Sequence, residues 1–250
     1  MIIDVNCWTG PWGTHALPGE AAQVRESLRR IGVDRMCLSP LGGVWAHNCH
    51  EANGAVYAAA DQWDDVLPVP VLDPTIATWP EELERARQHG RAPLVKWLPQ
   101  YGRYAPEEMT ECAGAIAEAG LGLLVQVRLE DARRQHPLAV VEDANPAAVA
   151  RLAERHRDLT VVLGGAPGGA IAQLAGPLLE LDNLYAEVSQ VDGMDALAGL
   201  VQAGLGRRLL FGTHAPFFVP LAGLARVVAD LDDEPAAAIL GGNASFLVAD

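Results

Sequence analysis

PEEMTECAGAIAEAGLGLLVQVRL, residues 106–129, contains one complete unit of the pattern that decides the fold. An Ala-rich stretch with helical spacing covers residues 106–119, Gly120 ends it, and the apolar run 121–129 then predicts a buried strand. The helical stretches 20–31 and 80–89 likewise end at a glycine. This pattern predicts a chain built of short strands that alternate with helices.

Strand-like segments recur about every 25 to 35 residues through the chain. Eight such units in 250 residues fit a closed (β/α)8 barrel, whereas an open doubly wound sheet normally has fewer strands. No linker or internal repeat divides the sequence, so we expect an α/β fold, a single TIM barrel over residues 1–250. The predicted strands are 2–8, 35–40, 66–72, 94–99, 121–129, 159–164, 184–189 and 208–212.

Composition limits the partners. With 32 acidic and 18 basic residues the net charge is −14, which disfavours nucleic acid and anionic membranes and leaves a small-molecule substrate as the expected partner. No apolar run reaches the roughly 20 residues of a membrane span, and the first residues lack the features of a signal peptide. We expect a soluble, cytoplasmic protein with reduced cysteines, whose Ala/Leu-rich outer helices would permit a homodimer.

Polar side chains stand near the carboxyl ends of five predicted strands. In a TIM barrel these ends converge on one face, where the chemistry takes place. Period-two alternation places Asp4, Asn6 and Trp8 on one face of the first strand. The other polar positions are Lys96, Gln126 and Arg128, Glu187 and Ser189, and Thr213 and His214.

Lys96 is the only lysine in the chain, against 17 arginines. One explanation is that the site needs a titratable amine, and the other is chance in an Arg-biased composition. His214 directly follows the last strand, where an imidazole is a candidate general base. Both residues are therefore candidates for catalysis.

From end to end the chain resembles the amidohydrolase superfamily, in particular its barrels that hydrolyse or decarboxylate small acids and lactones. The resemblance implies a TIM barrel and an enzyme of this kind. The segments that carry it are IIDVNCW (2–8), GVDRMCLSP (32–40), LPVPVLDP (67–74), LVKWLPQY (94–101), GRRLLFGTHAP (206–216) and ILGGNASFLV (239–248).

The chain departs from this family at the metal site. The family uses two histidines on the first strand, one histidine after each of the fifth and sixth strands, and an aspartate after the eighth. The corresponding residues here are Asn6, Trp8, Gln126, Gly165 and His214. Such a set is a poor ligand sphere for a divalent ion, so we expect no metal and no cofactor. The cluster HNCH at 47–50 has metal-site residue types without standard spacing.

A smaller branch of these barrels is similar at two further places. QVRLEDARRQHP, residues 126–137, resembles the Gln-x-Arg strand of that branch and the loop that follows it, and GTHAPFF, residues 212–218, resembles its last strand end. This resemblance places Glu130, Asp131, Arg133 and His136 in a loop over the barrel mouth. There they would bind a polar substrate or form a salt-bridged lid.

The leading hypothesis is a metal-independent hydrolase that acts on a small carboxylated or carbonyl-bearing substrate. In this hypothesis Arg128 and Lys96 hold a carboxylate or oxyanion, His214 activates water, and Asp4 orients nearby groups. Two alternatives stay open: a catalytically silent barrel that binds a small anion or a protein partner, and a Schiff-base lyase at Lys96. The expected substrate-binding residues are Asn6, Trp8, Gln126, Glu187 and His136.

Overall fold

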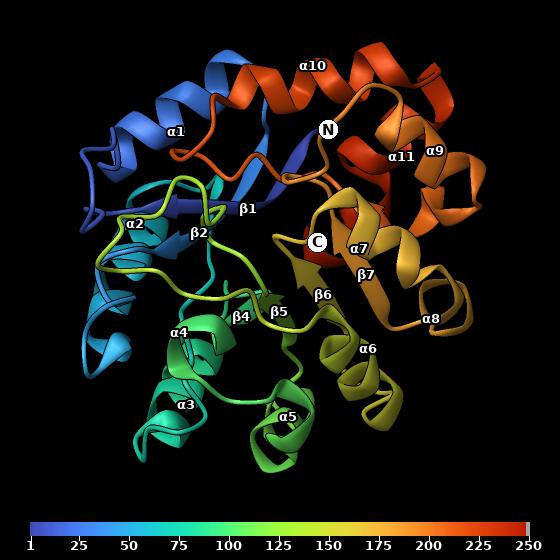
Figure 1. Ribbon diagram of the computed structural model, residues 1–250. Coiled ribbons are helices and arrows are strands. Elements are labelled where there is room, and N and C mark those ends of the chain that lie inside the picture. Colours follow the sequence, from blue (N-terminus) through green and yellow to red (C-terminus); the bar gives the residue numbers. More distant parts are fainter. Residues whose placement is uncertain (249–250) are drawn as a thin grey trace.

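Eight parallel strands ring the centre of the computed structural model, which describes residues 1–248, and the helices lie outside them (Figure 1). The strands pair as two sheets, with the orders β1-β2-β3 and β4-β5-β6-β7-β8. All eight predicted strands are present. They are β1 (Ile3–Thr9), β2 (Arg35–Pro40), β3 (Val66–Pro68), β4 (Leu94–Trp97), β5 (Gly122–Gln126), β6 (Val161–Gly164), β7 (Leu184–Glu187) and β8 (Leu209–Leu210).

Backbone hydrogen bonds join the two sheets at both edges. Between β8 and β1, the amide of Val5 donates to the carbonyl of Phe211 over 2.9 Å, and the amide of His214 donates to the carbonyl of Asn6 over 2.9 Å. Between β3 and β4, the amide of Leu72 donates to the carbonyl of Lys96 over 2.8 Å. The prediction of a TIM barrel is confirmed.

The third strand is shorter than predicted, because it ends at Pro68 and not at Leu72. Pro68 and Pro70 have no amide hydrogen and so cannot donate to a neighbouring strand. Beyond them only Val71 pairs with β4, as a single bridge to Lys96. The strand-like run was therefore interrupted by its own prolines.

The helices surround the strands. Helical bounds were predicted for three stretches, and those of 20–31 and 80–89 agree with the structure to within one residue. The stretch 106–119 is an exception, because it divides at Met109 into a short 3-10 helix and α5. The helices are α1 (Ala21–Arg30), α2 (Gly54–Gln62), α3 (Trp79–His89), α4 (Pro99–Gly102), α5 (Thr110–Glu118), α6 (Pro146–Arg155), α7 (Gly168–Gln173), α8 (Ala175–Glu180), α9 (Ala196–Gln202), α10 (Pro220–Asp230) and α11 (Asp233–Leu240).

A bulge in β1 corrects the prediction that Asp4, Asn6 and Trp8 share one face. Asp4 pairs with Met36 and Cys7 pairs with Leu38, so β1 has one more residue than β2 between these pairs. Below the bulge Ile3 and Val5 pack inside the barrel, and Asp4 alternates to the other side. The extra residue then turns Asn6 inward, which simple alternation could not predict.

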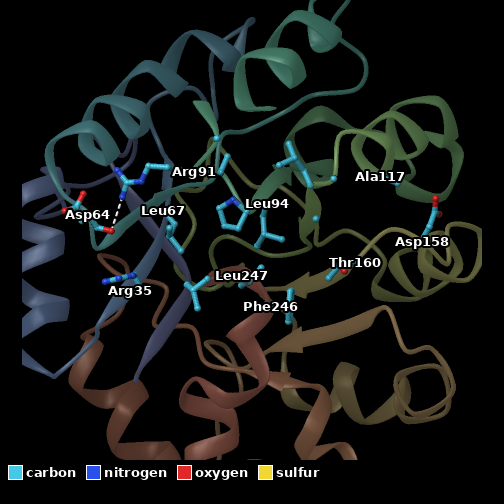
Figure 2. A pocket seen from close by; sticks show the side chains of 17 residues that line it. Arg35, Asp64, Leu67, Arg91, Leu94, Ala117, Asp158, Thr160, Phe246 and Leu247 are labelled. Atoms are coloured by element: carbon cyan, nitrogen blue, oxygen red, sulfur yellow. Dashed lines mark hydrogen bonds between the residues drawn. The ribbon is translucent and has the colours of Figure 1, made fainter. Parts of the chain in front are cut away.

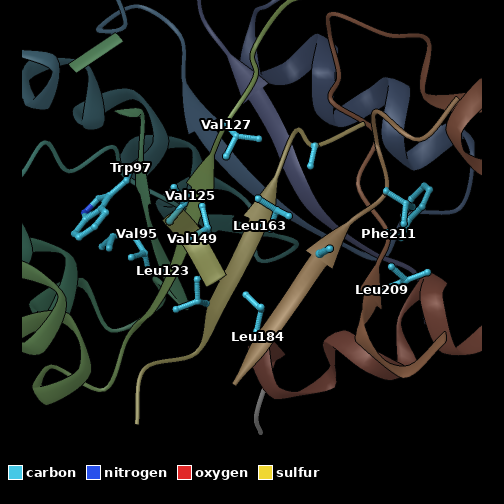
Figure 3. Close-up of a cluster of buried hydrophobic side chains, with 14 of the residues drawn as sticks. Val95, Trp97, Leu123, Val125, Val127, Val149, Leu163, Leu184, Leu209 and Phe211 are labelled. Atoms are coloured by element: carbon cyan, nitrogen blue, oxygen red, sulfur yellow. The ribbon is translucent and has the colours of Figure 1, made fainter. Parts of the chain in front are cut away.

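Apolar side chains fill both sides of the strands. One cluster packs the outer faces of β4 to β8 against the helices, and Figure 3 shows it with Trp97, Leu123 and Phe211. A second cluster, which includes Val5, Leu94 and Leu124, fills the barrel interior toward the strand beginnings. On these strands the next side chains that face the barrel interior are polar. The interior therefore changes from apolar to polar toward the carboxyl ends of the strands.

Two other expectations concern the thiols and the membrane. All four cysteines are free and buried, in accord with the reduced state that their spacing predicted. Within residues 1–248, the helices are too short or too polar to cross a bilayer.

Asn53 supports the weakly paired segment after β3, and its replacement gives a test of this fold. Its amide donates to the carbonyl of Val71 over 2.8 Å and accepts from the amide of Val71 over 2.8 Å. We expect Asn53→Ala to lower the free energy of unfolding by about 2–4 kcal/mol, because it leaves buried backbone groups unpaired. Urea unfolding measures this. The control is Asn145→Ala, which removes an exposed helix cap worth about 1 kcal/mol; equal losses would contradict the prediction.

Candidate active site

Four strand-end side chains meet in one hydrogen-bonded group inside the barrel, which we call the Asn6 cluster: Asn6, Lys96, Gln126 and Glu187. Lys96 Nζ donates to Asn6 Oδ1 over 2.7 Å. Asn6 Nδ2 donates to Gln126 Oε1 over 3.0 Å and to Glu187 Oε1 over 2.9 Å. Each of the four side chains belongs to a residue that is at most 1% exposed. Residues 181 positions apart in the chain are thus in direct contact.

Lys96 holds a cationic group in the barrel centre. Its Nζ lies 3.7 Å from the centre of the Trp8 ring, which supplies a cation–π contact. Burial lowers the pKa of Lys96 to about 7, although the nearby Glu187 and Asp4 act in the opposite direction. The ammonium and the free amine are therefore both populated near neutral pH.

Glu187 provides a fixed carboxylate beside Lys96. Its Oε1 accepts from the amide of Gly165 over 2.6 Å, and its Oε2 accepts from the amide of Ser189 over 2.7 Å. The Ser189 hydroxyl also donates to Oε1 over 2.9 Å. With the bond from Asn6, this carboxylate has partners on both oxygens, so it balances charge and does not need a ligand to satisfy it.

His214 lies against the cluster as a neutral imidazole. Its Nε2 is 2.7 Å from the carbonyl oxygen of Leu129, so Nε2 carries the hydrogen, and its Nδ1 accepts from the Trp8 indole over 3.3 Å. Burial, together with the charge of Lys96, lowers the pKa of His214 to about 3, while the hydrogen bond with Leu129 opposes the shift. Both ring nitrogens are engaged, so this conformation leaves the imidazole no free lone pair for water.

Asp4 positions the segment that carries His214. Its Oδ2 accepts from the Thr213 hydroxyl over 2.5 Å, and its Oδ1 accepts from the amides of Asn6 and Thr213. Burial raises the pKa of Asp4 to about 6, while these hydrogen bonds oppose the shift. The carboxylate thereby ties the end of β8 to the bulge of β1.

Two of the residues expected at the site lie away from the cluster. The Arg128 guanidinium pairs with Asp143, because a carboxylate on the same loop is within its reach. Only its backbone takes part, since the Arg128 carbonyl accepts from Gln126 Nε2 over 2.6 Å. His136 is exposed, and its Nδ1 accepts from the amide of Leu138. Neither side chain contacts Lys96 or Asn6.

A layer of bulky side chains lies between the cluster and the barrel mouth. Trp12 and Phe217 pack there with Trp8 and Leu129. The Trp12 indole donates to Glu130 Oε2 over 2.9 Å, which connects the loop after β1 to the loop after β5. Sequence reasoning missed Trp12, although a tryptophan directly after the first strand is a signal for such a cover.

A cavity of about 660 Å³ lies at the opposite end of the barrel. Figure 2 shows its wall, with Arg35, Leu67 and Leu94 at the beginnings of their strands. Arg91 also lines it, but this guanidinium donates to four backbone carbonyls and is already satisfied. Strand beginnings contribute to stability in TIM barrels, so the chemistry is assigned to the Asn6 cluster.

Across residues 1–248, no group of three or more His, Cys, Asp or Glu side chains is arranged to hold a metal ion. The HNCH segment at 47–50 has a structural part instead. His50 Nε2 accepts from the amide of Asp73 over 2.9 Å, and Asn48 caps the short helix that follows.

The pH dependence of stability tests the state of Lys96. Its pKa is lowered to about 7 from the ordinary value of 10.5, so the unfolded chain binds more protons between these values. We therefore expect the wild type to gain stability relative to Lys96→Met as the pH rises from about 7 to 10. The slope would approach about 1.4 kcal/mol per pH unit. Urea unfolding at several pH values measures it, and a constant difference between the two proteins would contradict the lowered pKa.

Comparisons with known proteins agree with this fold. The chain matches the structure described as Metarhizium anisopliae IDCase with a TM-score of 0.73 and 13% identity, over 99% of this chain and 97% of that one. A TIM-barrel protein of Bordetella bronchiseptica gives 0.73 and 16%, over 99% and 98%. The 5-carboxyvanillate decarboxylase of Novosphingobium aromaticivorans, solved with manganese, gives 0.72 and 14%, over 100% and 96%.

A search of the curated proteins found no match. A family model described as amidohydrolase matches residues 41–247, which is most of the chain and extends from the end of β2 to the C-terminal 3-10 helix. The fold and this match together show that the chain belongs to the amidohydrolase family.

Proposed function

We propose that this protein is an enzyme that hydrolyses a small carboxylated substrate at the Asn6 cluster without a bound metal ion. Lys96 is the residue on which the proposal depends: its free amine takes a proton from water, and the ammonium so formed pairs with the oxyanion of the substrate. The observation that supports it is a buried lysine whose pKa is near 7 at the carboxyl end of a barrel strand. Perturbed amines of this kind are suited to acid–base catalysis at neutral pH.

Hydrogen-bond capacity distinguishes Lys96 from the other titratable groups of the site. Both oxygens of Asp4 and of Glu187 accept hydrogen bonds, and both nitrogens of His214 are engaged. Among the described residues, the Lys96 ammonium donates one hydrogen bond, to Asn6, and faces the Trp8 ring. An ammonium has three protons to donate, so Lys96 retains capacity for a ligand.

The proton balance of the hydrolysis follows from this pKa. The free amine of Lys96 removes a proton from water as the water oxygen bonds to the substrate carbonyl, and the ammonium so formed returns that proton to the leaving group. The positive charge of the ammonium stabilises the oxyanion between these steps. Asn6, which itself donates to Gln126 and Glu187, holds Nζ in place throughout. The proton taken from water leaves with the leaving group, so the site returns to its starting charge.

The side chains present do not fit the metal that the family implies. The centre of the site holds an ammonium, and Asn6 presents its amide hydrogens to Gln126 and Glu187. A Cβ added at Gly165 would lie 2.3 Å from Gln126 Nε2, so a histidine has no room there. Glu187 is the one carboxylate in the cluster, and its oxygens are already satisfied. We therefore derive no step through a metal.

Substrate access requires the covering layer to move. The Asn6 cluster is buried beneath Trp12, Leu129 and Phe217, and the bond between Trp12 and Glu130 connects the loops on the two sides. Burial of the site also favours the second candidate, a silent barrel whose cluster serves only to complete the core. A substrate-dependent reaction distinguishes the two.

Turnover in Lys96 variants tests the proposal. A panel of small esters, lactones and aromatic acids that carry a carboxylate is screened by mass spectrometry, which also detects loss of carbon dioxide and so separates hydrolysis from decarboxylation. We expect Lys96→Met to lower kcat about 10²–10⁴-fold, and the kcat profile to rise with an apparent pKa near 7. Lys96→Arg keeps the charge but not the titration, so it should bind substrate with little turnover. The control is the surface variant Arg151→Met; Lys96→Met with full activity would contradict the proposal.

Metal removal provides a separate test. We expect the enzyme dialysed against a chelator to retain its turnover, and added Mn²⁺ or Zn²⁺ not to increase it, because the centre already holds a cation of its own. Elemental analysis of each sample accompanies the assay. Loss of activity on chelation with recovery on addition of metal would refute metal independence.

A further inference from the structure

Four aromatic rings gather at the barrel mouth above the Asn6 cluster. The Trp12 ring centre lies 5.6 Å from that of Trp45, 6.3 Å from that of Tyr101 and 5.2 Å from that of Phe217. The Trp45 and Tyr101 rings also meet edge to face at 4.9 Å. Tyr101 comes from α4 and the other three rings from the segments after β1, β2 and β8, and together they form an aromatic enclosure centred on Trp12.

A carboxylate stands in this enclosure with one oxygen unused. Glu130 is 5% exposed, and its Oε2 accepts from the Trp12 indole. Its Oε1 is buried and has no hydrogen-bond partner among the described residues. The nearest imidazole, that of His15, has its Nδ1 3.7 Å from Oε1, beyond hydrogen-bond distance. A buried carboxylate oxygen without a donor is unfavourable, so this position favours a ligand that supplies one.

The position of Glu130 relative to the rings indicates the chemistry of that ligand. The carboxylate accepts from the indole of Trp12, the ring around which the other three gather. An organic cation is attracted both by a carboxylate and by the faces of aromatic rings. We propose that Glu130 and the rings of Trp12, Trp45, Tyr101 and Phe217 form a binding site for the ammonium group of a small organic ligand.

The outer side of the enclosure is in contact with solvent. Trp45 is 46% exposed, and the His15 side chain is 35% exposed. Trp45 and Tyr101 also line a cavity of about 280 Å³ on this side.

The ammonium site and the Asn6 cluster are connected by stacked rings. Phe217 stacks on His214 at 5.1 Å, His214 contacts Trp8 edge-on at 6.0 Å, and Trp8 covers Lys96. The ammonium site is independent of the proposed function, but the inference that the ammonium group is part of the substrate rests on that function. The substrate would then place the carbonyl to be hydrolysed at Lys96 and a free ammonium group at Glu130.

Binding of simple ions to the full chain tests the site. The probes are butylammonium and butyrate, which have the same chain length and opposite charge, and binding is followed by calorimetry and by tryptophan fluorescence. Glu130→Gln keeps the size of the side chain and an oxygen for the Trp12 indole but removes the charge. Asp131→Asn is the matched control, because it removes one negative charge from the next residue, which pairs with Arg133 outside the enclosure. Thermal unfolding confirms that each variant is folded.

We expect Glu130→Gln to bind butylammonium about tenfold more weakly than the wild type, and Asp131→Asn and Lys96→Met to bind it as the wild type does. Equal affinity of the wild type and Glu130→Gln would overturn the ammonium site, as would an equal loss in Asp131→Asn or the absence of saturable binding to the wild type. Butyrate reports separately on Lys96. If Lys96→Met fails to weaken butyrate while Glu130→Gln weakens butylammonium, the proposed function fails and the ammonium site stands.

Discussion

The amide of Asn6 is the contact on which the interior of this barrel depends. Its oxygen accepts from Lys96 and its nitrogen donates to Gln126 and Glu187, so one neutral group links a buried cation to a buried anion. Without such a link, two desolvated charges would face each other with unpaired donors and acceptors, which is costly in a medium of low dielectric. An amide is suited to this position because it offers a donor and an acceptor on opposite atoms.

The backbone irregularity of β1 explains how an amide comes to lie there. An extra residue between Asp4 and Cys7 turns the Asn6 side chain into the barrel. The Asp4 carboxylate stabilises this bulge, because it accepts hydrogen bonds from the amide of Asn6 and from the Thr213 hydroxyl. The same carboxylate thereby fixes the residue before His214. The bulge of β1 and the position of the segment after β8 therefore depend on the same contact, between Asp4 and Thr213, at the point where the first and last strands meet.

The sequence predicted the eight strands, because hydrophobic periodicity and the glycines that end helices are local patterns. It also predicted that distant strand ends meet, because the carboxyl ends of the strands converge in any TIM barrel. It could not predict the bulge, which depends on the register of β1 against β2, and so it placed Asp4 on the wrong face. The sequence also could not predict that Arg128 pairs with Asp143, because Asp143 lies 15 residues further along an irregular loop. The contact of Trp12 with Glu130 joins two loops, and no periodicity reports on such a pair.

The charge balance of the site bears on how a family with metal-dependent members could contain this chain. Glu187 brings negative charge into the barrel centre, and negative charge in a buried site requires a cation nearby. In the manganese-containing relative a metal ion is present, whereas here the Lys96 ammonium provides positive charge from the chain itself. An ammonium differs from a metal ion in one respect that matters for chemistry: it can lose its proton. In the proposed mechanism Lys96, whose pKa burial lowers to about 7, acts as a base in one half of the reaction cycle and as a cation in the other. The proposed exchange of metal for lysine would then change the means of catalysis and keep the electrostatic need of the barrel satisfied.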